Sequence, residues 1–266
     1  MTTGIRSWIL GAVAIGAAWG PYGAPLTANS TAAKSPVVIA ELFTSEGCSS
    51  CPPADTVLSQ LAQQPPTDVV VLTIGEHVDY WDRLGWHDRF SSAEFSARQS
   101  VYDANAFHRN EIYTPQLVID GRFARVGSDV NGIRRDIKNA AQTEKAAVDV
   151  TIAGLRGRVL QLDLRAQLAT AYVPRGPIDV VLAATEDNLV TEVQAGENRG
   201  RTLRHDGVAR WMRSVATLDG GERVWAARTD LPLAADWNAA NVKAICFLQE
   251  RESRRIIGAG AARLLD

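Results

Sequence analysis

The clearest pattern along the chain is a series of short apolar runs separated by turn-forming residues. The run Val37–Phe43 is rich in β-branched residues, which predicts a buried strand. After a glycine-containing turn, the apolar residues Val57, Leu58, Leu61 and Ala62 recur at helical spacing. The pattern therefore predicts a strand, a tight turn and a helix in direct succession.

The alternation of strands and helices continues to about residue 145. Residues 68–74 predict a second buried strand, parallel to the first, with the intervening helix as the crossover. The sequence Ser91–Glu94 is a capping-box pattern that opens a helix to about Ala106. Asp120-Gly121 between two short runs predicts a hairpin, and a last helix follows it. The predicted order over residues 36–145 is strand, helix, strand, helix, strand, strand, helix.

From about Ala147 the pattern changes to short strands with turns between them. This predicts an antiparallel β-sandwich as a second domain over residues 147–266. Residues 196–206, rich in charge and glycine, predict a long hairpin loop. Its tip is expected either to be solvated or to dock onto the first domain. The strand candidates are residues 148–152, 160–166, 177–184, 223–228, 242–249 and 256–264.

Residues 1–33 have the parts of a secretory signal peptide and its tail. Arg6 precedes the apolar run Trp8–Trp19, and small residues follow. That run is shorter than the about 20 residues that span a bilayer, although an uncleaved membrane anchor stays open. We therefore expect an exported protein, periplasmic or secreted.

Composition narrows the function classes further. The chain has 266 residues, of which 46% are hydrophobic and 22% charged, with a formal net charge of −2. This is ordinary globular composition, and the absence of a basic run argues against nucleic acid as a partner. The chain has 3 cysteines, too few for a disulfide scaffold.

Two of these cysteines, Cys48 and Cys51, lie between the first predicted strand and helix. A C-x-x-C pair in this context is typical of a redox motif, and a helix N-terminus stabilises a thiolate. We expect Cys48 to be the exposed, attacking thiol and Cys51 the shielded one, although the proline pair after Cys51 places the dithiol slightly before the regular helix. A structural disulfide is an alternative. A zinc site would need two more ligands, and the third cysteine, Cys246, is expected to be a buried free thiol, with an intermolecular disulfide as the alternative.

With Thr114-Pro115 just before its third strand, the first half resembles the thioredoxin superfamily. That resemblance implies a cis Thr114–Pro115 bond beside the dithiol, with the Thr114 backbone free to pair with a peptide. More closely, three segments resemble a secreted bacterial family catalogued as domain-of-unknown-function family 1223. The resemblance implies a fold and a dithiol but no substrate. The segments are Glu41–Asp55, His77–Trp86 and Gly196–Leu203.

Two further features bear on chemistry. Glu41 lies within the first apolar run, where it is expected either beneath Cys51 as a general base with a raised pKa, or at an edge of the strand, solvated or paired to an arginine. The loop from His77 to Asp88 has histidines and carboxylates that suit a metal, but the favoured interpretation is a loop that faces substrate, with Trp81 packed near the dithiol.

The sequence thus predicts an α/β thioredoxin-like N-terminal domain, an antiparallel β-sandwich C-terminal domain and a thiol–disulfide oxidoreductase. We expect no metal, no other cofactor, and no membrane contact after leader cleavage. The expected partners are a thiol or disulfide protein substrate and an unknown redox partner. The alternatives are a metal-binding or metallochaperone module on Cys48 and Cys51, or a binding protein without turnover. The expected catalytic residues are Cys48, Cys51, Pro115 and Glu41, and the expected substrate-positioning residues are Thr114, His77 and Trp81.

Overall fold

The structure, a computed structural model, describes residue 1 and residues 35–109, 111–219 and 221–264. The expected signal peptide at residues 1–33 lies outside the described residues, apart from Met1. Ser35–Asp266 form one compact unit. The expected boundary between residues 145 and 147 lies inside this unit, between a helix and a strand.

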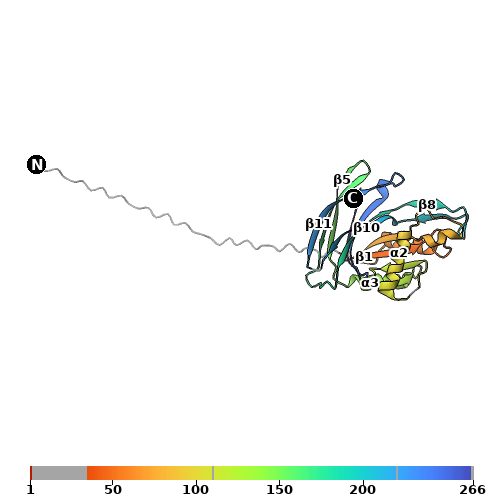
Figure 1. The fold of residues 1–266 in the computed structure, drawn as a ribbon, viewed down its shortest axis with the longest axis horizontal. Coiled ribbons are helices and arrows are strands. Elements are labelled where there is room, and N and C mark those ends of the chain that lie inside the picture. The colour runs from red at the N-terminus through yellow and green to blue at the C-terminus, as the bar shows by residue number, and fades with distance from the viewer. Residues whose placement is uncertain (2–34, 110, 220, 265–266) are drawn as a thin grey trace. The chain divides into compact units, whose positions relative to one another are not determined.

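The first half of the unit has the element order that the sequence predicts (Figure 1). The predicted helix is observed, but its N-cap is Ser92, one residue later than the capping-box pattern predicts, and the Ser92 side chain accepts a hydrogen bond from the Glu94 N–H. The predicted hairpin turns at Asp120 and Gly121, both with positive φ. The elements are β1 Val37–Thr44, α1 Pro52–Gln63, β2 Val70–His77, the 3-10 helix η1 Asp79–Leu84, α2 Ala93–Tyr102, the π-helix η2 Asp103–Phe107, β3 Gln116–Ile119, β4 Phe123–Val126 and α3 Val130–Ala141.

The second half consists almost entirely of strands. Every predicted strand is observed, and three more occur that the sequence pattern did not indicate: β8, β9 and β10. The elements are β5 Ala147–Arg156, β6 Val159–Gln167, β7 Ile178–Glu186, β8 Leu189–Glu192, β9 Thr202–His205, β10 Val208–Leu218, β11 Val224–Pro232, the 3-10 turn η3 Ala239–Asn241, β12 Val242–Glu250 and β13 Ile256–Arg263.

The two halves share one mixed sheet of eight strands in the order β13-β12-β7-β10-β2-β1-β3-β4. The strands β1 and β2 are parallel, as predicted, and β10 joins β2 through a parallel pairing of Val208 with Gly75. The remaining strands form an antiparallel three-stranded sheet, β11-β6-β5, and the short hairpin β8–β9. The fold is therefore a mixed α/β structure with a large sheet and a sandwich-like antiparallel part.

Strand alternation determines which face of the large sheet each helix covers. In β1, Ala40 and Leu42 pack with α1 and α3, whereas Ile39 packs with Phe95 of α2 on the opposite face. The three-stranded sheet packs through Leu162 and its neighbours onto the antiparallel half of the large sheet. Because burying one such aliphatic side chain stabilises a fold by about 1.5–3 kcal/mol, these layers hold β1 and its following turn in place.

Candidate active site

The turn between β1 and α1 holds a disulfide between Cys48 and Cys51, whose Cα atoms lie 5.4 Å apart. The Cys51 N–H donates to the Cys48 carbonyl oxygen at 3.2 Å, which closes the turn. Regular helix begins only at Pro52, with Cys51 as its N-cap residue. The proline pair therefore places the dithiol just before the helix, as the sequence indicates.

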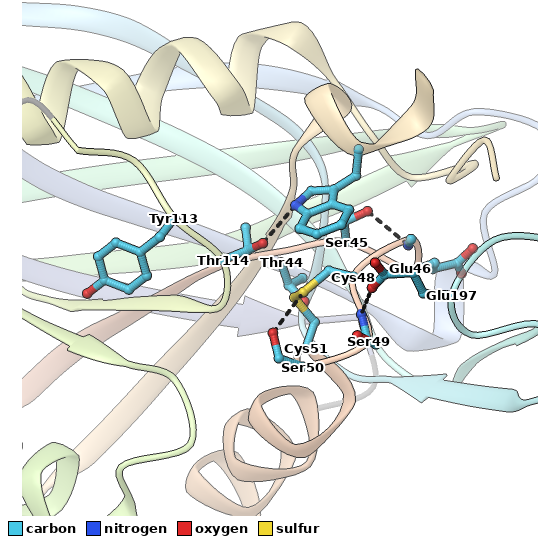
Figure 2. The surroundings of a disulfide bond; sticks show 12 residues. Thr44, Ser45, Glu46, Cys48, Ser49, Ser50, Cys51, Tyr113, Thr114 and Glu197 are labelled. Atoms are coloured by element: carbon cyan, nitrogen blue, oxygen red, sulfur yellow. Dashed lines mark hydrogen bonds between the residues drawn. A yellow bond between two sulfur atoms is a disulfide. The ribbon is translucent and has the colours of Figure 1, made fainter. Parts of the chain in front are cut away.

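Both cysteines are fully buried, whereas Ser49 and Ser50 between them are exposed. The expectation of an exposed Cys48 is therefore wrong for this disulfide-bonded state. The Ser50 hydroxyl contacts the Cys48 sulfur at 3.3 Å (Figure 2). A substrate that approaches from solvent meets the serines first, and the sulfur atoms only after a neighbouring segment moves.

The loop of the β8–β9 hairpin, residues 193–201, hereafter the cover loop, packs against the backbone of the dithiol turn. The buried Asn198 donates from Nδ2 to the carbonyl oxygens of Glu46 and Cys48, at 2.8 and 2.9 Å. The Glu197 carboxylate accepts the Ser49 N–H at 3.0 Å (Figure 2), and this contact lowers the pKa of Glu197. The 196–206 segment therefore docks onto the first half rather than forming a solvated tip.

Thr114 lies on another side of the disulfide (Figure 2). The Trp81 indole N–H donates to the Thr114 hydroxyl at 2.8 Å. The Trp81 side chain also packs against Gly47, where an added Cβ would lie 3.4 Å from the Trp81 Cβ. The predicted cis bond between Thr114 and Pro115 is confirmed. The structure thus brings three of the expected site residues to the dithiol.

Glu41 is not beneath Cys51, so the general-base position expected for it is wrong. It points to the α2 face of the sheet, away from α1, where Arg98 donates from Nε at 2.7 Å and the Tyr102 hydroxyl also donates. Glu41 is fully buried, so the arginine pairing that was the alternative occurs inside the protein rather than at a strand edge. Its role in this position is structural.

A second buried carboxyl, Glu76 on the neighbouring strand, shares the Arg98 guanidinium at 3.5 Å. Burial and the charge of Glu41 raise the pKa of Glu76 well above its ordinary value. Burial by itself would lower the pKa of Arg98, but its carboxylate partners outweigh that effect and raise it. Glu41 and Arg98 therefore form a buried ion pair, and Glu76 beside them is a neutral acid.

His77 is also buried, with 1% of its surface exposed, so it does not face substrate directly. Its Nδ1 lies 2.6 Å from the Asp88 carboxylate. Burial opposes the charge on His77, but Asp88 outweighs burial and raises the pKa of the imidazole. Burial would likewise raise the pKa of Asp88, but His77 and two backbone donors lower it to about 2. The two side chains form a buried ion pair.

The other polar residues of the His77 loop lie nearer the surface. His87 is exposed and pairs through Nδ1 with Asp82 at 2.8 Å. Across residues 35–264, apart from the undescribed positions, no group of three or more His, Cys, Asp or Glu side chains is arranged to hold a metal ion. No observation of this loop therefore favours the metal hypothesis.

Sequence reasoning missed Asp55, which lies in the first turn of α1. Its side chain is 7% exposed and accepts a hydrogen bond from the Thr44 hydroxyl at 2.8 Å. Burial raises the pKa of this carboxyl, although the nearby His205 opposes the shift. Asp55 follows Cys51 by four residues, so both occupy the same helix face. That spacing is a signal that the sequence offers.

Glu46 and His205 were missed as well. His205, at the end of β9, lies between Asp55 and Glu46, with ring-nitrogen to carboxylate distances of 3.7 and 3.5 Å. Its ring is 5.0 Å from that of His77. Glu46 lies two residues after the end of β1 and accepts the Trp86 indole N–H at 2.8 Å. His205 is 150 or more residues from these partners, and no sequence pattern points to it.

Cys246 on β12 is a buried free thiol, as expected. Burial raises its pKa to about 12. It packs in the core between the two sheets rather than near the dithiol turn. Among the described residues, no helix has both the length and the apolar character needed to cross a bilayer.

Comparison with known proteins finds a family but no assigned activity. The family model described as "Protein of unknown function (DUF1223)" matches residues 39–249. A structural-genomics protein from Agrobacterium tumefaciens is similar, with 29% identity and a TM-score of 0.62 over 85% of this chain and 93% of that one. HBP35 of Porphyromonas gingivalis shares the fold, with 13% identity and a TM-score of 0.66 over 87% of this chain and 76% of that one. None of the curated proteins compared with the chain matches it.

Proposed function

The chain belongs to the DUF1223 family, whose description names no function, and we propose from its own site that it is an exported thiol–disulfide oxidoreductase. Cys48 and Cys51 exchange electrons with a protein or small-molecule thiol. The dithiol belongs to a thioredoxin-like arrangement formed by residues 36–145.

The observation that carries this proposal is the disulfide between strand β1 and helix α1, with Thr114 and Trp81 beside it. The element order of the first half and the C-x-x-C spacing are those of the thioredoxin resemblance. A purely structural disulfide would not need buried ionisable groups around it, yet Asp55 and His205 lie next to the turn. Export is proposed from the charged start, apolar run and small residues of positions 1–33.

In the reducing direction, the Cys48 thiolate attacks one sulfur of a substrate disulfide. That bond breaks, the departing sulfur takes a proton from solvent, and Cys48 remains in a mixed disulfide. Cys51 then loses its proton and attacks the Cys48 sulfur. The Cys48–Cys51 bond forms, the second substrate sulfur leaves and takes a proton, and two electrons have passed to the substrate. The oxidising direction is the reverse of these steps.

We assign Asp55, in place of Glu41, as the carboxylate that accepts the proton of Cys51. It shares the helix face of Cys51, and its N–H donates to the Cys51 carbonyl oxygen at 3.1 Å. Its raised pKa brings a carboxylate closer to the working pH, which suits a proton acceptor. Glu41 points to the opposite face of β1 and is occupied by Arg98.

The proposal is tested with the reduced protein and insulin as a disulfide substrate. Wild type should reduce insulin, whereas Cys48→Ala should not, and Cys51→Ala should accumulate a mixed disulfide at Cys48. Cys246→Ala, which changes a thiol remote from the turn, is the control and should keep the wild-type rate. Equal rates for wild type and Cys48→Ala, in either the reduction of insulin or the oxidation of a reduced peptide, would contradict the proposal.

A further inference from the structure

Behind the dithiol lies a buried chain of ionisable side chains contributed by three separate segments. Asp55 comes from α1, Glu46 from the turn after β1, and His205 from the end of β9. Their exposed fractions are 7%, 0% and 3%. Such groups are costly to bury, so their presence next to a reactive pair requires a reason.

The contacts within this chain are incomplete. His205 Nε2 and Glu46 Oε1 are buried, lie 3.5 Å apart, and have no hydrogen-bond partner among the described residues. An unpaired buried polar group costs about 1–3 kcal/mol. A carboxylate therefore lies close to each ring nitrogen of His205, Glu46 at 3.5 Å and Asp55 at 3.7 Å, so a proton on the imidazole has an acceptor on either side.

The two ends of the chain lie at the two cysteines. Asp55 is on the helix face of Cys51, and Glu46 lies in the turn that leads to Cys48. The titratable groups that face His205 are Asp55, Glu46 and His77, and His77 is already occupied by Asp88. His205 is thus the titratable link between the Cys51 side and the Cys48 side.

We propose that His205 is a positioning residue for the dithiol. His205 takes up, through Asp55, the proton that Cys51 releases, and it shares that proton with Glu46. This inference rests on the proposed function. His205 touches neither sulfur, so it acts only through Asp55. When Cys51 attacks the mixed disulfide, its proton moves to Asp55 and on to His205. The released substrate thiolate takes a proton from solvent, and His205 afterwards releases its proton to solvent, so protons and charge balance over the whole step.

His205 lies on the same β8–β9 hairpin that contacts the dithiol turn. The same hairpin carries Asn198, which donates to the Cys48 carbonyl oxygen. The hairpin therefore both contacts the dithiol turn and supplies His205. A substrate that displaces only the cover loop leaves β9 and His205 in place. Removal of the whole hairpin would also remove His205, and Asp55 could then no longer pass on the proton of Cys51.

The first test measures resolution of a mixed disulfide between Cys48 and glutathione in single-turnover experiments across pH. In His205→Gln, resolution should be about tenfold slower than in wild type at pH 7, because general acid–base groups contribute at least that much. The deficit should shrink to about twofold above pH 9, where Cys51 ionises without help, since a free thiol has a pKa of about 8.5. His87→Gln, an exposed histidine, is the control and should follow wild type. A His205→Gln profile parallel to that of wild type would overturn the proposal.

The second test uses wild type alone and remains valid if the variant does not fold. The titration of the His205 imidazole is followed by nitrogen NMR in the disulfide form and after reduction with a phosphine. The relay predicts a shift in the His205 titration midpoint on reduction, with no shift for His87. If the midpoint shifts but wild type does not exchange with thiols, the proposed function fails, whereas the coupling between His205 and the dithiol stands. An unchanged midpoint overturns the relay whatever the exchange activity.

Discussion

At the scale of single residues, Glu41 and Glu76 compete for one buried guanidinium. Burial and the charge of Glu41 together raise the pKa of Glu76, so replacing Glu41 by Gln removes one of the two causes, and Glu76 should then ionise and take over the pairing with Arg98. We expect each single Gln variant to be mildly destabilised. The double variant leaves Arg98 without a carboxylate and should lose about 3–5 kcal/mol. The free energies of unfolding in urea of wild type, the two single variants and the double variant test this expectation. A double-variant loss equal to the sum of the two single losses would contradict it.

The buried His77–Asp88 pair predicts a pH-dependent stability. Because the folded-state pKa of His77 is raised, its contribution is complete below the unfolded value of 6.5 and is lost as pH rises through the raised pKa. The lowered pKa of Asp88, about 2 against 3.8, adds a contribution of roughly 2 kcal/mol that is lost as pH falls from about 4 to about 2. The stability gap between wild type and His77→Gln should therefore be widest between about pH 4 and 6.5. A gap independent of pH would contradict this account.

The sequence predicts the dithiol and the proline, but it leaves open both the burial of Glu41 and the direction of its side chain. Both faces of β1 are covered, so its apolar run does not indicate which face α1 occupies. The residue that shares the Cys51 helix face, Asp55, follows from helical spacing alone. His205 does not, because its position depends on a pairing between distant strands.

At the scale of elements, the cover loop holds the dithiol turn through hydrogen bonds, so we expect it to limit access to the disulfide. Asn198→Ala removes two hydrogen bonds that tie the loop to the dithiol turn. Each is worth about 0.5–1.5 kcal/mol, so reduction of the Cys48–Cys51 disulfide by dithiothreitol should be several-fold faster. Gln194→Ala, an exposed position on the same hairpin, is the control. Equal reduction rates for Asn198→Ala and wild type would show that the loop does not limit access.

The strands that the sequence did not reveal are informative about why patterns fail. Strand β10 contains two register irregularities, between Ala209 and Trp211 and between Ser214 and Ala216, which interrupt its alternation. The strands β8 and β9 have four residues each and pair only with each other. By contrast, the Asp120-Gly121 turn has residues suited to positive φ, and that hairpin was predicted correctly.

At the scale of the whole molecule, the shared sheet links the site to the second half. Strand β10 pairs with β2, and the hairpin before it covers the dithiol. We expect residues 35–266 to unfold in one cooperative transition, with tryptophan fluorescence and circular dichroism changing together. Two separated transitions would instead indicate that residues 36–145 and 147–266 are independent domains.

The most direct measurement of the central claim is the reduction potential of the Cys48–Cys51 pair in the whole protein. It is obtained by equilibrating the protein with dithiol buffers and counting alkylated cysteines. A dithiol that exchanges with substrates should titrate between about −120 and −270 mV, the range of known oxidoreductases. A value below about −300 mV is that of a structural disulfide and would contradict the account.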